Sequence, residues 1–148
     1  MPDQLNVSEI KTILGFDFGL TKIGVAVGQM VTKTASPLTL LSAQDGAPQW
    51  TDVQQLIEEW SPQLLIVGYP LQMDGTEQAV TKAAKRFGNR LAGRFQLPVE
   101  WVDERLSSYD AELYLADLNI SSESDKLNLD TISAKLIIEQ WFNQIDAN

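Results

Sequence analysis

The sequence contains no cysteine and no histidine. Without cysteine there is no disulfide, no thiol nucleophile and no thiolate metal site. Without histidine there is no Ser-His-Asp triad, and the usual general base and the commonest zinc ligand are both missing. Any catalysis must therefore rest on carboxylates, lysine, tyrosine or hydroxyl groups. Any bound metal would be a hard ion held by oxygen, such as Mg²⁺ or Mn²⁺.

The chain also lacks a long hydrophobic run and an excess of positive charge. No run of about 18 apolar residues is present, so no membrane-spanning helix is predicted. The first residues lack the basic start and apolar block of a signal peptide. Together with the missing cysteines, this predicts a cytoplasmic protein. The formal net charge of −9 repels phosphates at long range, which argues against nucleic-acid binding unless basic residues gather locally.

The length of 148 residues predicts a single domain spanning residues 1–148. We expect a loose tail at residues 1–11 and a mobile polar loop at residues 119–129. Apolar patterning predicts five strands, at residues 12–19, 23–28, 34–41, 63–68 and 98–102. Apolar residues at helical spacing, with a capping signal at Ser107, predict helices at residues 49–60, 76–95, 107–117 and from 130 onward.

The order of these elements predicts the fold class. Three strands come first and can pair antiparallel, and each of the next two follows a helix and can pair parallel. The third strand belongs at an edge, because Pro37 lacks a backbone donor. We therefore expect an α/β fold with a mixed five-stranded sheet and helices on both faces.

Asp17 lies inside the first strand, where the pattern favours an apolar residue. Alternation directs Leu14 and Phe16 to one face and Ile13 and Asp17 to the other. A buried carboxylate is costly without a metal, a cation or hydrogen-bond donors. An acid that reaches solvent at a strand end explains Asp17 equally well. The glycines that follow fit the close approach of a phosphate or metal, and they also fit an ordinary hairpin.

Two further acidic positions could join Asp17. Asp103 and Glu104 follow the fifth strand, and ligands of open α/β sheets bind beyond the carboxyl ends of strands. The alternative is that both acids lie in solvent just after the strand and that Arg105 pairs with one of them. Asp130 lies on the inward stripe of the last helix, or it caps that helix. Three converging carboxylates would hold one or two divalent ions, which promote phosphodiester hydrolysis.

The helix predicted at residues 76–95 is strongly basic. Glu77 is the only acid in its sequence from residue 77 to 95, against five basic residues: Lys82, Lys85, Arg86, Arg90 and Arg94. A solvated helix face is the ordinary explanation. The alternative is a local phosphate-binding surface, since the Debye length at physiological salt is only about 8 Å.

Four segments resemble, in order, the blocks of the YqgF/RuvX family: GFDFGLTKIGVAVG, IVGYPLQMDGTEQ, VDERLSSYDAE and LDTISAKLIIEQWF. The resemblance covers about residues 12–145. Members are described as pre-16S ribosomal RNA nucleases and as Holliday-junction resolvase-like proteins. The resemblance implies a ribonuclease H-like fold and a Mg²⁺- or Mn²⁺-dependent nuclease. Its partners would be precursor ribosomal RNA, branched DNA or ribosomal particles, and it would act as a monomer or homodimer.

The resemblance, carried over by position, assigns catalysis and metal binding to three acids, Asp17, Glu104 and Asp130. Asp103 is the alternative metal ligand to Glu104, because consecutive residues of a strand face opposite sides and only one of the two would face the metal directly. It assigns phosphate contacts to Lys22 and Arg105, and the basic helix would add Lys82, Lys85, Arg86 and Arg90.

The sequence departs from the family pattern at two of these blocks. Lys22 stands where the family usually has Arg, which removes a bidentate phosphate contact, and Ser133 stands where Ala is usual. The first departure and the acidic charge leave open a ribosome-assembly factor with weak or no catalysis. A phosphotransferase is a third hypothesis, because DFGLTK also resembles the first phosphate loop of actin- and hexokinase-type ATPases. Those enzymes clamp ATP between two domains. A single domain of 148 residues cannot supply the second half of such a site, so this hypothesis ranks last.

Overall fold

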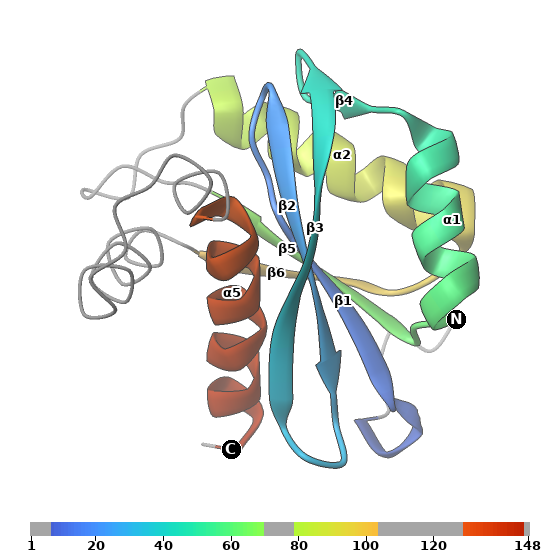
Figure 1. The fold of residues 1–148 in the computed structure, drawn as a ribbon, viewed down its shortest axis with the longest axis vertical. Coiled ribbons are helices and arrows are strands. Elements are labelled where there is room, and N and C mark those ends of the chain that lie inside the picture. The colour runs from blue at the N-terminus through green and yellow to red at the C-terminus, as the bar shows by residue number, and fades with distance from the viewer. Residues whose placement is uncertain (1–6, 70–78, 104–128, 147–148) are drawn as a thin grey trace.

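The computed structural model describes residues 7–69, 79–103 and 129–146 (Figure 1). The helix predicted at residues 107–117 lies outside these ranges, and so does the predicted loop at 119–129 apart from Leu129. Most of the predicted N-terminal tail also lies outside them. The last residues of that tail form the 3₁₀ turn η1, Val7–Glu9, and Ile10 after it is buried.

The described residues form six strands: β1 Thr12–Asp17, β2 Lys22–Gln29, β3 Thr34–Gln44, β4 Ala47–Pro48, β5 Leu64–Tyr69 and β6 Val99–Asp103. They also form three α-helices: α1 Trp50–Trp60, α2 Ala79–Phe95 and α5 Leu129–Asp146. No helix in this part of the chain is long and apolar enough to cross a membrane.

The strands form one mixed sheet in the order β4-β3-β2-β1-β5-β6. Strands β1 to β4 pair antiparallel, and β1, β5 and β6 pair parallel. The predicted mixed α/β architecture is confirmed, but the predicted count of five strands is wrong. The additional strand, β4, has two residues and pairs with Ala43 and Gln44. Two residues are too few to show an alternating pattern in the sequence.

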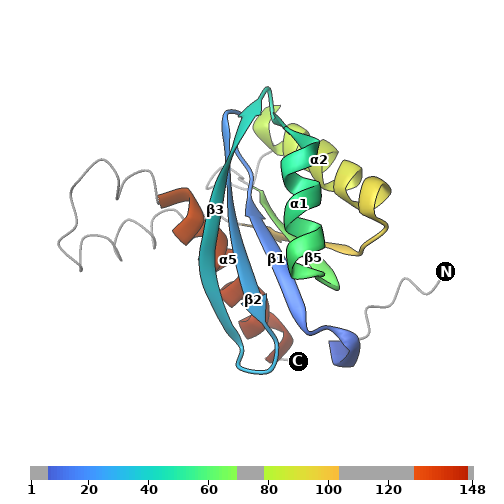
Figure 2. The ribbon, with the colours of Figure 1, turned by 45° about the vertical axis from the view of Figure 1, so that its right-hand side comes forward.

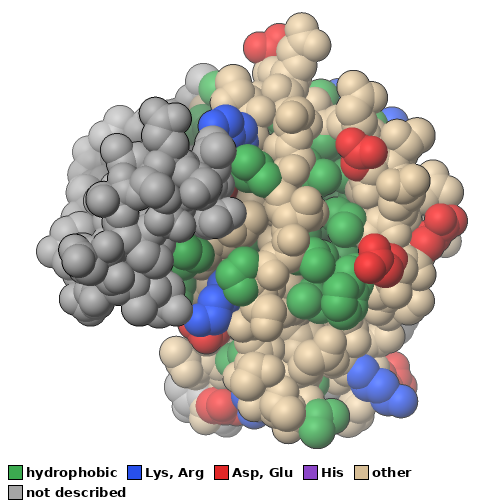
Figure 3. All heavy atoms as spheres, viewed as in Figure 1, with side chains coloured by type: hydrophobic (Ala, Val, Ile, Leu, Met, Phe, Trp, Pro, Cys, Tyr) green, Lys and Arg blue, Asp and Glu red, His purple; other side chains and the backbone are tan. Residues whose placement is uncertain are grey.

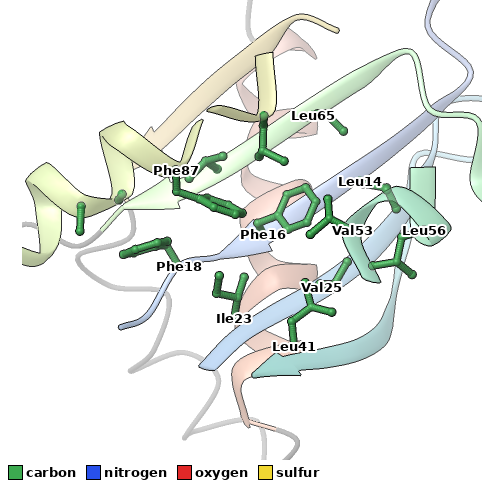
Figure 4. Packing of buried hydrophobic residues seen from close by; sticks show 14 of the residues in the cluster. Leu14, Phe16, Phe18, Ile23, Val25, Leu41, Val53, Leu56, Leu65 and Phe87 are labelled. Carbon is green, nitrogen blue, oxygen red and sulfur yellow. The ribbon is translucent and has the colours of Figure 1, made fainter. Parts of the chain in front are cut away.

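Helices cover both faces of the sheet, as predicted. Helices α1 and α2 lie on one face and α5 lies on the other (Figure 2). Strand β1 contributes Leu14 and Phe16 to the first core and Ile13 to the second, so its side chains alternate as expected. In the first core, Phe16 meets Phe87 of α2 edge to face, with ring centroids 5.5 Å apart (Figure 4).

Helix α5 packs very close to β1 and β2 because small residues face it. A Cβ atom added at Gly15 would lie 2.5 Å from the Ile138 side chain, and one added at Gly28 would lie 2.7 Å from the same side chain. Ala26 lies between these contacts and is fully buried in the second core. The glycines thus let the backbones of helix and sheet approach, and this approach positions the first turn of α5.

Candidate active site

Asp17 is the last residue of β1 and only 7% of its surface is exposed. Alternation along β1 places it on the face covered by α5, together with Ile13 and Gly15. Its partners on the two neighbouring strands are Gly24 of β2 and Gly68 of β5. The carboxylate is therefore flanked across the sheet by two residues without side chains. The solvated strand-end explanation of Asp17 is wrong, because the residue is buried.

Asp130 comes to the same place from the far end of the sequence. A Cβ atom added at Gly24 would overlap the carbonyl oxygen of Asp130 and would lie 2.9 Å from the backbone nitrogen of Thr131. The first turn of α5 thus rests on the residue paired with Asp17. Asp130 is helical and partly buried, whereas a capping residue precedes the helix. Asp130 therefore lies within the first described turn of α5.

This packing also corrects one explanation of the glycines after Asp17. The sequence left open whether they make room for a phosphate or a metal. At Gly24 the space is filled by the backbone of α5. Gly19 instead closes the turn into β2, since a Cβ atom there would lie 2.5 Å from the carbonyl oxygen of Lys22. That turn brings Lys22, at the start of β2, back toward the end of β1.

Burial raises the pKa of Asp130, and the positive charge of Lys22 partly opposes this rise in pKa. The first effect arises because a partly desolvated carboxylate is less stable than the neutral acid. The second shows that the Lys22 ammonium lies within electrostatic reach of Asp130, although its own side chain is exposed. The structure thus places the backbone of Asp130 against the strand partner of Asp17, and it places the charge of Lys22 within electrostatic reach of Asp130.

We expect Lys22→Met to raise the pKa of Asp130 further, because it removes the opposing charge and leaves the burial. The pKa can be followed by ¹³C NMR of the Asp130 carboxyl carbon. Since the folded-state pKa lies above the ordinary 3.8, ionised Asp130 weakens folding at neutral pH, and this loss is relieved as pH falls through that pKa. Lys33→Met is the matched control, since Lys33 follows the far end of β2 and pairs with Asp146. An equal rise in both variants would contradict the assignment.

Asp103, the other predicted metal ligand, lies at the adjoining strand ends. Asp103 ends β6 and pairs with Tyr69 at the end of β5, one residue beyond the partner of Asp17. The carboxyl ends of β1, β5 and β6 therefore share one edge of the sheet. Glu104 and Arg105 lie outside the described residues. Among the residues that the structure describes, no three acidic side chains form a group that could hold a metal ion.

One buried hydroxyl next to this site had no functional signal in the sequence. Ser133 lies one turn after Asp130, is 1% exposed, and has no hydrogen-bond partner for Oγ within the described part of the chain. Thr131, on the first turn of α5, is also buried. The contact between α5 and Gly24 brings the helix turn that carries these residues next to the end of β1, although the two segments are far apart in sequence.

The predicted basic surface on α2 is exposed. Lys82, Lys85, Arg86, Arg90 and Arg94 all lie at the surface. The guanidinium carbon of Arg94 lies 4.5 Å from the centre of the Trp50 ring, a cation–π contact. Phe18, which follows Asp17, belongs to the core under α2. The basic helix therefore covers the sheet face opposite to the one that carries Asp17.

The family of this chain is shown by its similarity to known proteins. The family model described as "RuvX: Holliday junction resolvase" matches residues 11–144. A protein of Nitrosococcus oceani is 50% identical over 142 residues, which are 96% of this chain and 93% of the relative. A protein of Shewanella denitrificans is 52% identical over 137 residues, 92% of this chain and 97% of the relative. This chain belongs to the RuvX family.

The two RuvX relatives are both named "Putative pre-16S rRNA nuclease". Solved structures show the fold of this RuvX chain. Thermus thermophilus RuvC has a TM-score of 0.54 at 13% identity, over 91% of this chain and 96% of that chain. The fowlpox virus resolvase, solved with Holliday junction DNA, has a TM-score of 0.54 at 10% identity. The match covers 93% of this chain and 99% of the resolvase chain. The ribonuclease H-like fold implied by the sequence is confirmed.

Proposed function

We propose that this RuvX protein is a metal-dependent nuclease that hydrolyses phosphodiester bonds in structured RNA. The precursor of 16S ribosomal RNA would be its substrate, free or in ribosomal particles in the cytoplasm, and branched DNA would be a second substrate class. The observation that supports the proposal is the packing of the Asp130 backbone against Gly24, the strand partner of buried Asp17, at the carboxyl end of β1. The names of the relatives support the RNA substrate.

The residues at this edge suit a hard divalent ion. With no histidine or cysteine in the chain, the donors are oxygen atoms, as Mg²⁺ and Mn²⁺ prefer. Asp17 and Asp130 would hold the ion, with Glu104 as a third carboxylate and Asp103 beside it. When bound, the ion supplies an activated water and stabilises the leaving oxygen.

The chain's own residues would bind and orient the phosphate. The backbone of Asp17 is held by its strand pairing to Gly24 and Gly68, and its side chain is buried. Lys22 lies close enough to influence Asp130 and would attract the phosphate as a point charge. Arg105 would add a directional, bidentate contact.

The proposal is tested by incubating the protein with a precursor 16S ribosomal RNA transcript. We expect cleavage in millimolar Mg²⁺ or Mn²⁺, none in excess EDTA, and recovery when the metal is restored. The mature RNA without the precursor extension is the matched control and should stay intact. Cleavage at the same rate in EDTA would contradict a metal-dependent mechanism, and degradation of both RNAs alike would contradict the proposed substrate.

A second candidate function is a ribosome-assembly factor with weak or no catalysis. The net charge of −9 and Lys22 in place of the family's usual Arg favour it, because both weaken phosphate binding. Titration calorimetry with Mn²⁺ in the presence of the RNA separates the two functions. Saturable binding at millimolar metal supports the nuclease, and its absence supports the assembly factor.

A further inference from the structure

The basic residues of α2 form a regular row rather than a scattered charge. Lys82, Arg86, Arg90 and Arg94 are each four residues apart, so they form one ridge along the helix, called here the α2 ridge. Successive members are about 6 Å apart along the helix axis, and the whole ridge spans about 18 Å. All four side chains are exposed, and Lys85 lies beside them.

The near end of the α2 ridge lies close to the candidate active site, but on the other face of the sheet. A Cβ atom added at Gly46 would lie 2.7 Å from Phe18 and 3.6 Å from Ala83. Phe18 follows Asp17 directly, and its ring lies 5.4 Å from Phe87 of α2. The first half of α2 is therefore packed against the residue next to Asp17, while Asp17 itself faces α5.

The far end of the α2 ridge is held in place next to an acidic helix. Arg94 lies over the Trp50 ring at the start of α1. Helix α1 carries three acidic residues, Asp52, Glu58 and Glu59, and no basic residue. Figure 3 shows acidic side chains on the side of the molecule that α1 forms. A polyanion lying on α2 is thus repelled by α1, which confines it to the ridge.

These features favour a nucleic-acid backbone over a protein as the partner. A protein interface needs large apolar anchors, yet the only exposed large hydrophobic residues in the described part of the chain are Leu20 and Val31, and neither is on α2. A repeating row of arginine and lysine suits a repeating row of phosphates. The chain is acidic overall, so this local row must supply attraction that the rest of the surface does not.

We propose that the α2 ridge is a second docking site, which binds a segment of the nucleic-acid substrate away from the bond to be cut. The inference rests on the proposed function, because it takes RNA as the substrate. It separates two sets of phosphate contacts. Lys22 serves the phosphate near Asp17 and Asp130, and the ridge serves a flanking strand that has passed to the other face of the sheet. The affinity of the protein for RNA should therefore be higher when the RNA is long enough to reach from the candidate active site to the α2 ridge.

The test measures binding in EDTA, so that it does not depend on cleavage. The probes are a fluorescein-labelled RNA hairpin with a long single-stranded extension and the same hairpin without it, and fluorescence anisotropy is read over a series of NaCl concentrations. The variant Lys82→Gln/Arg86→Gln should bind the extended RNA more weakly. Its slope of log affinity against log salt should fall by about 1.4, or about 0.7 for each lost contact with a single strand. Binding of the short hairpin should change much less.

The control variant is Lys11→Gln/Lys33→Gln. It makes the same change in net charge, and both residues lie at the opposite end of β1 and β2 from Asp17. The control should bind both probes like the natural protein. Equal losses in the two variants, equal losses on the two probes, or no binding of RNA by the natural protein would each overturn the inference. If RNA is bound through the ridge but never cut, the docking site stands and the proposed nuclease function fails.

Discussion

Asp17→Asn is expected to reduce metal-dependent RNA cleavage by more than about 100-fold, since the loss of even an outer-shell partner at a metal site costs 10- to 100-fold. The substitution keeps the shape of the side chain and removes its negative charge. Asp17 is buried between Gly24 and Gly68, so no neighbouring side chain on these strands can take its place. The initial rate of cleavage of the precursor RNA, at saturating Mg²⁺, measures the effect.

The same substitution should leave the fold intact, and this separates a lost site from a lost structure. Asparagine has nearly the same volume as aspartate, so the core around residue 17 stays filled and we expect the circular dichroism spectrum to match that of the natural protein. Asp52→Asn is the matched control, because Asp52 is an exposed acid on α1, on the other face of the sheet. Asp17→Asn protein that cuts at the natural rate would remove Asp17 from the mechanism.

Much of the fold could be predicted because its signals are local. Strand β1 alternates its side chains between two cores, and β5 is apolar throughout because both of its faces are covered. Both patterns can be read within six residues of sequence. Strand β4 could not be predicted in this way, because a two-residue strand has no period and depends on pairing with Ala43 and Gln44.

The sequence predicts that acids could converge at one end of the sheet, but not the packing contact that brings the start of α5 there. The sequence identifies Asp17 and Asp130 as unusual acids at the ends of apolar segments. It does not show that the first turn of α5 rests on Gly24, because this contact joins residues far apart in the chain and depends on the absence of a side chain. That contact brings the start of α5 next to the end of β1.

Gly24→Ala is the second substitution with a large expected effect. It should lower both the stability of the fold and the activity of the candidate site. Gly24 does not have a positive φ angle, so alanine fits its backbone conformation and the cost is steric. The added methyl group would overlap the carbonyl of Asp130, which is backbone and cannot rotate away. We expect the free energy of unfolding to fall by about 3 kcal/mol, the upper part of the range for overpacked cores. Thermal and urea denaturation measure this loss.

Gly93→Ala is the matched control for Gly24→Ala. Gly93 lies in α2, and a Cβ atom there would have nothing within 4 Å. Because alanine is the better helix former, the control should raise the free energy of unfolding by about 1 kcal/mol. If the free energy of unfolding falls in Gly24→Ala and rises in Gly93→Ala, the same added methyl group has opposite effects. The loss at residue 24 then comes from the contact with α5. A loss at residue 93 as large as that at residue 24 would contradict this explanation.

The effect of Gly24→Ala on the site can be measured separately from its effect on stability. At a temperature where the variant remains folded, the displaced α5 should expose Asp130, so the pKa of Asp130 should fall toward its ordinary value as burial decreases. RNA cleavage should be lost under the same conditions, because Asp130 has moved away from Asp17. If the pKa of Asp130 and the cleavage rate both stay unchanged in the folded variant, then the contact at Gly24 does not position the two carboxylates.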